Sequence, residues 1–151
     1  FNLKDNDESF NAFIKALIED FDSEIQHYPK LNFYIIGQGI NTSQSIVNCL
    51  KANLQDSALR HIFKTDRCNF TKDYLGYRRD LINNAIREYA KSKDNVTFVD
   101  RNAAQALGDG KFRTRTDGGK ALYYDKTHYT TPGGNMVGQY VFSQVFNSEN
   151  L

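Results

Sequence analysis

The residues with the clearest chemical potential are an aspartate and a histidine near the end of the chain, Asp125 and His128. They follow the apolar run Leu-Tyr-Tyr and precede Tyr-Thr-Thr-Pro-Gly-Gly. At a strand-to-helix junction, an aspartate three positions before a histidine can accept a hydrogen bond from one ring nitrogen. That bond would fix the tautomer and leave the other nitrogen free to take a proton. The pair supplies two members of a hydrolase triad, and the third, a nucleophile, has to be sought elsewhere.

The position of the pair favours chemistry over a purely structural role. An Asp-x-x-His sequence is common, and a histidine near a helix start is more often a satisfied polar group than a catalyst. Here, however, the pair is expected to follow a strand and to precede a Pro-Gly turn and a closing helix. Open α/β sheets place their sites at the carboxyl ends of strands. We therefore predict Asp125 and His128 as site residues.

Three helices are predicted where apolar residues recur every three or four positions. The first spans residues 7–28 and ends before Pro29, the second spans 72–93, and the last runs from about residue 134 to 146. The stretch 43–63 contains only helix-like pieces, around 46–54 and 57–63.

Two parallel strands and one hairpin are predicted between these helices. Residues 32–37 and 95–100 are short, almost continuous apolar runs, which are typical of strands covered on both faces. In 111–116, apolar or threonine positions alternate with arginines, and Asp-Gly-Gly at 117–119 is expected to turn this strand back toward 121–124. The element order predicts an α/β sandwich with a mostly parallel sheet. The chain opens on a helix with no strand before it, so the sheet is expected to lack its first strands.

Length and charge limit the classes of partner. The 151 residues are 40% hydrophobic, which suits one domain or most of one. The net charge of +1 gives no electrostatic reason to expect nucleic acid or an anionic membrane as a partner. No run approaches the roughly 20 apolar residues of a membrane helix, and the first residues lack the basic and apolar regions of a signal peptide.

The other reactive side chains give weaker predictions. Cys49 and Cys68 could form a disulfide or remain two buried thiols, and the sequence leaves both open. With His128, the histidines His27 and His61 show no metal-ligand spacing, so we expect no metal and no cofactor. A row of basic residues is formed by Lys111, Arg113 and Arg115. They could bind an anionic glycan or protect a solvated edge strand by their charge, and we prefer the second interpretation. Arg78 and Arg79 are expected on the wet face of a helix, and Gln38-Gly39 could border the site.

The end of the chain resembles a known family. Residues 123–133 read Tyr-Tyr-Asp-x-x-His-Tyr-Thr-x-x-Gly. This is similar to the last sequence block, Leu-Tyr-x-Asp-x-x-His-Leu-Ser-x-x-Gly, of the SGNH hydrolases, as found in the extracytoplasmic domain of O-antigen-acetylase-like acyltransferases (the acyltransferase 3 family) of bacterial envelopes. Residues 33–38 resemble the family strand that ends in Gly-Gln, and 78–100 resemble its long helix and following strand. The resemblance implies a three-layer α/β/α, flavodoxin-like sandwich, of which 1–151 is the C-terminal portion.

The resemblance also implies roles for the pair. His128 would be the general base that activates a serine, and Asp125 would orient it, for acyl transfer through a covalent ester. The Gly-Asp-Ser nucleophile block of the family should precede the first helix, and the sequence does not contain it. Ser43 and Ser45 stand in no such turn. Either the block lies on sequence outside this chain or this relative has lost its nucleophile.

Two functions follow as expectations. The first is part of an O-acyltransferase or esterase domain that acts on acetyl or other acyl esters of cell-surface glycans such as lipopolysaccharide, at the periplasmic or extracytoplasmic face of a bacterial membrane. Its partners would be the acylated glycan and an upstream membrane acyltransferase region of the same protein. The second is a non-catalytic domain that binds a glycan or a protein on the same fold. In either case we predict that the isolated chain turns nothing over.

Overall fold

The computed structural model of the chain describes residues 7–40, 70–71, 74–108 and 110–146. The elements follow in the order α1 (Asp7–His27), β1 (Phe33–Ile36), β2 (Phe70–Thr71), α3 (Tyr74–Lys91), β3 (Val96–Val99), the 3-10 helix η2 (Arg101–Gln105), β4 (Ala106–Gly108), β5 (Lys111–Phe112) and α4 (Thr131–Phe146). The three predicted helices and the two predicted parallel strands are present, each within a few residues of its predicted ends. Cys49, Cys68, Ser43, Ser45 and His61, and the helix-like pieces at 46–54 and 57–63, lie outside the described residues.

The two apolar runs form a parallel pair. Phe33 lies opposite Val96 and Ile36 opposite Val99, with α3 in the connection between the two strands. Val96 and Val99 are buried, but the Ile36 side chain at the end of β1 is 50% exposed. The prediction that β1 is covered on both faces is therefore wrong at its last residue. Within the described part of the chain, β1 pairs along one edge only.

A second, antiparallel sheet differs from the predicted hairpin. Strand β5 pairs with β4 on one side and β2 on the other, rather than with residues 121–124. The predicted turn does form, because Gly119 has a positive φ of 78° and donates to the carbonyl of Thr116 at 2.8 Å. Beyond the turn, the predicted strand at 121–124 is replaced by isolated bridges, one joining Arg115 to Ala121. With β2 and β4 on its two sides, β5 is already paired along both edges, and the contacts of the predicted hairpin lie beyond it, as in the bond from the Leu122 amide to the Thr114 carbonyl at 2.8 Å.

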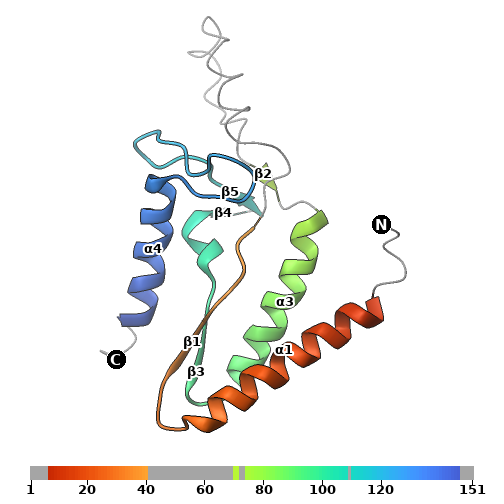
Figure 1. Cartoon of the computed structure of the whole chain (residues 1–151). Coiled ribbons are helices and arrows are strands. Elements are labelled where there is room, and N and C mark those ends of the chain that lie inside the picture. The colour runs from red at the N-terminus through yellow and green to blue at the C-terminus, as the bar shows by residue number, and fades with distance from the viewer. Residues whose placement is uncertain (1–6, 41–69, 72–73, 109, 147–151) are drawn as a thin grey trace, which may run out of the picture.

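Helices α1 and α3 share a core with the parallel sheet. The buried members of this cluster are Ile25, Tyr89, Ala90 and Val96. The phenol of Tyr89 donates to Asp22 Oδ1 at 3.0 Å, and Lys93 Nζ lies 2.5 Å from the same oxygen, so a polar contact joins the two helices beside the apolar one. Figure 1 shows the N-terminal half of α1 projecting away from the sheet.

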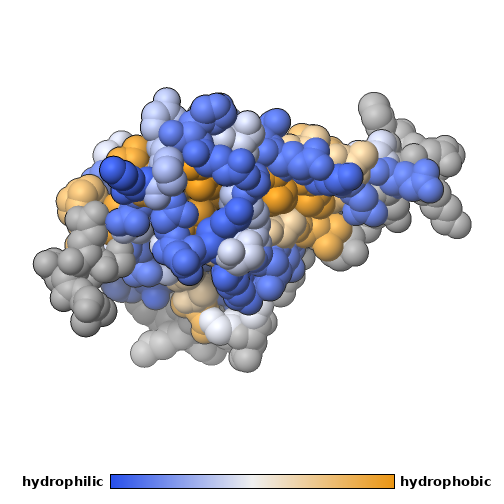
Figure 2. Space-filling view, turned by 90° about the horizontal axis from the view of Figure 1, so that it is seen from below, coloured by the Kyte–Doolittle hydropathy of each residue, from blue (hydrophilic) through white to orange (hydrophobic). Residues whose placement is uncertain are grey.

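The surface shown in Figure 2 is mainly hydrophilic, with apolar side chains visible in separate patches. Large apolar side chains that are at least 49% exposed occur on several elements: Phe13, Tyr28, Leu31, Ile36, Tyr124, Phe142 and Phe146. No helix among the described residues is long and apolar enough to cross a membrane.

A second cluster holds the loop that leads into α4. Its buried residues are Ile40, Phe112, Leu122 and Tyr123, with Tyr129 and Met136 packed against them. In Figure 1, α4 begins at the end of the molecule where β1 and β3 finish, and the blue loop before it lies at that same end. The fold is α/β, as predicted, with a small parallel sheet, and this loop lies near the carboxyl ends of its strands.

Candidate active site

The loop that carries Asp125 and His128 is closed by backbone contacts at its base. Tyr123 and Tyr129 form an isolated antiparallel bridge, and the Tyr124 amide donates to the His128 carbonyl at 3.1 Å. Thr130 then links the loop to α4, because its hydroxyl donates to the Ala121 carbonyl at 2.5 Å while its own carbonyl accepts from the Gly134 amide at 2.8 Å. Asp125 and His128 thus lie on a loop closed by hydrogen bonds at its base, and not directly after a strand as predicted.

The Asp125 carboxylate contacts His128 twice. Oδ2 lies 2.7 Å from Nδ1 of the imidazole, and Oδ1 accepts from the His128 backbone amide, also at 2.7 Å. Oδ1 accepts in addition from the Thr127 amide at 2.7 Å. The contact predicted between the two side chains is therefore present, whereas their catalytic role stays a prediction.

The same hydrogen bonds set the charge of Asp125. They hold the pKa of its carboxyl well below the usual range, and the largest contribution comes from the Thr127 amide, followed by the His128 amide. Each bond favours the ionised carboxylate, which accepts more hydrogen bonds than the acid. A charged Asp125 at neutral pH is the partner that an Nδ1–H imidazole needs.

The surroundings leave the other ring nitrogen accessible. With the Nδ1 proton directed to Asp125, Nε2 becomes the basic nitrogen, and the His128 side chain is 65% exposed. The Tyr124 ring stacks on the imidazole, with centroids 5.5 Å apart and planes 18° apart. The hydroxyl of Thr127 lies 3.1 Å from Nδ1, on the side of the ring away from Nε2. Thr127 is therefore not placed as a nucleophile for this base.

Two buried amides hold the end of β1. Asn83 on α3 donates to the Gln38 carbonyl at 3.0 Å and accepts from the Gln38 amide at 2.7 Å. Asn102 donates to the same carbonyl at 2.9 Å and accepts from the Ile40 amide at 3.0 Å. Gln38, which the sequence suggested as a border of the site, is thus held at the carboxyl end of β1. The Gly39 carbonyl accepts from Arg79 at 2.6 Å, so Arg79 contacts the protein and is not confined to the wet face of its helix as expected. Sequence reasoning missed both asparagines, because an isolated asparagine carries no periodic pattern.

A third buried amide, Gln105, lies beneath the loop that carries Asp125 and His128. It is fully buried and contacts the phenols of both Tyr123 and Tyr129. Sequence reasoning missed it, since a single glutamine at the end of the short helix η2 has no distinctive spacing. The available indication of such a residue was the pair Tyr123 and Tyr129 on either side of the Asp125–His128 segment, because buried phenols need hydrogen-bonding partners.

The remaining predicted candidates stay apart from this loop. His27 ends α1 and its Nδ1 lies 2.6 Å from the Ser23 carbonyl, as expected for a surface helix residue. Arg113 pairs with Asp117 at 2.9 Å. Strand β5, which contains Lys111, has a neighbouring strand on each side, so the expectation that this basic row protects an edge strand is wrong for β5. In the part of the chain that the structure describes, no group of three or more His, Cys, Asp or Glu side chains could hold a metal.

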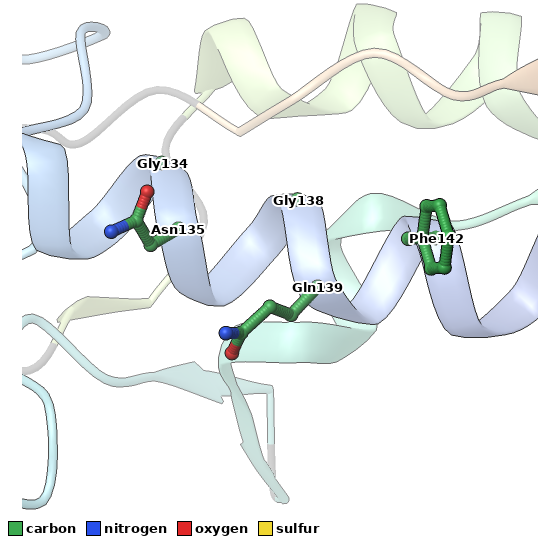
Figure 3. Close-up of a pocket in the computed structure, with 5 residues that line it drawn as sticks. All are labelled: Gly134, Asn135, Gly138, Gln139 and Phe142. Atoms are coloured by element: carbon green, nitrogen blue, oxygen red, sulfur yellow. The ribbon is translucent and has the colours of Figure 1, made fainter.

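A shallow groove of about 380 Å³ lies on α4 and not at His128. Figure 3 shows its lining side chains following one another along the helix, with the Phe142 ring at one end. No residue of the Asp125–His128 loop lines this groove.

An α/β frame with an aspartate-held imidazole on the loop before its closing helix is compatible with an acyl-transferring or ester-cleaving domain. A family model described as "SGNH domain (fused to AT3 domains)" matches residues 2–141, and the chain belongs to this family. The family predicted from residues 123–133 is thereby confirmed, and with it an acyl esterase or acyltransferase type of domain. No significant match is found among curated proteins or among solved structures.

Proposed function

We propose that this domain moves acyl groups, acetyl in the simplest case, onto or off hydroxyl groups of cell-surface glycans. The observation that supports this most is the 2.7 Å contact between Asp125 Oδ2 and His128 Nδ1 on an exposed loop, in a chain of the SGNH family. We further propose that a membrane acyltransferase region belongs to the same polypeptide, by analogy with the fusion to AT3 domains that describes the family, and that the domain lies at the extracytoplasmic face of the membrane.

The proposed chemistry is a serine-histidine-aspartate acyl transfer. Nε2 of His128 removes the proton of a serine hydroxyl while the serine oxygen attacks the carbonyl carbon of the acyl ester. The imidazolium, stabilised by Asp125, returns the proton to the leaving alcohol. A glycan hydroxyl or water, deprotonated by the same nitrogen, then attacks the acyl-serine ester, and the imidazolium returns the proton to the serine oxygen as its bond to the acyl group breaks. The proton transfer is worth on the order of 10²–10⁴-fold in rate.

The serine of this proposal lies outside this chain, which contains no Gly-Asp-Ser sequence. Residues 1–151 would be the C-terminal portion of a three-layer sandwich whose nucleophile and first strands are supplied upstream. Among the described strands β1 is paired with β3 alone, and a further strand could join the sheet on the other side of β1.

Replacement of the histidine tests the proposal. In the polypeptide that carries both this domain and its upstream region, His128→Ala should reduce hydrolysis of p-nitrophenyl acetate by 10²-fold or more, because the proton acceptor is gone. His27→Ala is the matched control, since His27 is an exposed histidine on α1, and it should retain full activity. Equal activity in the wild type and in His128→Ala would exclude this mechanism.

The isolated chain gives a second test. It should show no turnover that depends on His128, because no serine is positioned for the base. A rate that the wild type shows and His128→Ala lacks would place the nucleophile within residues 1–151 and contradict the proposed division.

The absence of the nucleophile sequence also favours a second candidate, a domain that binds a glycan or a protein without chemistry. Such a domain would use the exposed His128 and Tyr124 as contacts. The two candidates separate in the longer polypeptide. No turnover, together with glycan binding that weakens in His128→Ala, would favour the binding domain.

A further inference from the structure

One buried side chain connects the parallel sheet to the loop of the candidate active site. Gln105 is 0% exposed and ends η2, which directly follows β3. The start of η2 is fixed by Asp100, whose carboxylate accepts from the Asn102 amide at 3.1 Å and pairs with Arg87 at 3.1 Å. The Gln105 carbonyl accepts from the Arg113 amide at 2.9 Å. Gln105 is therefore tied to β3 through η2 and to Arg113 through its own carbonyl.

The amide of Gln105 is shared between the two tyrosines at the base of the loop. Its Nε2 donates to Tyr129 Oη at 2.8 Å, and its Oε1 accepts from the Tyr123 hydroxyl. The two rings lie against one another, with centroids 4.8 Å apart. Burial raises the pKa of Tyr123 well above its usual range, so this phenol stays protonated and able to donate even at a pH where an exposed tyrosine ionises. A side-chain amide offers a donor and an acceptor side by side, and Gln105 uses both here.

The two tyrosines also stand at the two ends of the loop. Tyr123 directly precedes Tyr124 and Asp125, and Tyr129 directly follows His128. The two tyrosines are joined by an isolated bridge and not by an extended ladder of strand pairs. A shift of one tyrosine relative to the other would therefore change the separation of Asp125 and His128.

We propose that Gln105 is a positioning residue for His128: by holding Tyr123 and Tyr129 together from below, it keeps Nδ1 on Asp125 and Nε2 toward the substrate. It contacts neither the reacting atoms nor the imidazole. The proposal concerns the geometry of the site, and its consequence for turnover rests on the proposed function.

The test reads the imidazole directly in the isolated chain, with Gln105→Met as the variant. Methionine has a similar length but forms neither hydrogen bond. Histidine-labelled protein is examined by two-bond ¹H–¹⁵N correlation above the titration range of histidine. The wild type should show His128 with the proton on Nδ1, and Gln105→Met should move it toward the Nε2–H form. His27, held by a backbone carbonyl on α1, is the internal control and should not change.

Two outcomes decide the proposal. A folded Gln105→Met protein whose His128 signals equal those of the wild type overturns it, whatever the change in stability. If that variant does not fold, Tyr129→Phe replaces it, because it removes one hydroxyl and keeps the ring; an unchanged His128 tautomer there also overturns the proposal.

In the longer polypeptide, Gln105→Met should lower kcat by on the order of 10²-fold with little change in KM, as expected when a reacting group is misplaced. An altered tautomer with no activity even in the wild type would refute the proposed function and leave the positioning role intact.

Discussion

Each oxygen of the Asp125 carboxylate has a different task. Oδ2 faces the imidazole, whereas Oδ1 accepts the amides of Thr127 and His128 and so holds the loop in its turn. An aspartate that both shapes a turn and orients a histidine explains a separation of only three residues. The carboxylate orders the backbone that brings the ring to it.

This double role predicts a specific behaviour in acid. The pKa of Asp125 is lowered from 3.8, so its hydrogen bonds stabilise the folded loop at every pH above about 4. Below that pH the stabilisation is lost gradually, as the carboxyl takes up a proton at its lower, folded-state pKa. Carboxyl ¹³C shifts followed from pH 6 to pH 2 should show Asp125 still ionised where an ordinary aspartate, with a pKa of about 3.9, is half protonated.

Asp125→Asn is the companion variant for this titration. It keeps an oxygen for the two amides but cannot balance an imidazolium, so the loop should stay ordered while the His128-dependent rate falls. A midpoint for Asp125 at the value of a free aspartate would show that the carboxylate is not held in this way.

At the scale of elements, α4 is placed by its contact with the residue before the loop. A Cβ on Gly133 would lie 2.1 Å from the Leu122 carbonyl oxygen, whereas one on Gly134 would meet nothing within 4 Å. The first turn of α4 therefore rests against the backbone of Leu122, next to Tyr123, and only glycine permits that approach.

The two neighbouring glycines make a matched pair for urea unfolding. Gly133→Ala should lower the free energy of unfolding by about 1–3 kcal/mol, because helix and loop must separate. Gly134→Ala should raise it by up to about 1 kcal/mol, because alanine loses less backbone entropy in a helix. If both variants change stability equally, the contact between α4 and Leu122 is not as close as described.

The sequence predicted the elements that have a strong period and missed those defined by tertiary contact. Regular spacing of apolar residues located α1 and α3, and continuous apolar runs located β1 and β3. Strand β2 has two residues and β4 has three, too few to show alternation, and they form because β5 offers them an edge. Helix α4 begins at Thr131 rather than near residue 134, since Thr130 satisfies its first amides.

In the candidate site, too, the residues close in sequence were predicted and the one brought in by tertiary contact was missed. Asp125 and His128 are close in sequence, so their spacing was enough to predict their contact. Gln105 lies 18 residues from Tyr123 and 24 from Tyr129, and no local pattern announces a partner at that separation. Only the folded chain brings this amide beneath the loop.

At the scale of the whole molecule, two separate cores support two separate tasks. The cluster around Tyr89 joins α1 and α3 to the parallel sheet, while the cluster around Tyr123 supports the loop and α4. The Tyr89 phenol is the polar centre of the first cluster, since it donates to Asp22. A change there should alter global stability and leave the Asp125–His128 contact unaffected.

The Tyr89 phenol makes this separation measurable at high pH. Burial, followed by its bond to Asp22, raises the pKa of Tyr89 from 10.0 to about 12. Its contribution to stability is complete below pH 10 and is lost as the pH rises from 10 toward 12. Tyr89→Phe should lower the free energy of unfolding by about 1 kcal/mol at pH 8. Above pH 10, the free energy of unfolding should decrease less steeply with pH in this variant than in the wild type. Tyr28→Phe, at a tyrosine that is 55% exposed, should follow the wild-type curve. If Tyr89→Phe also changed the His128 tautomer, the two cores would be coupled and the loop would depend on more than the amide beneath it.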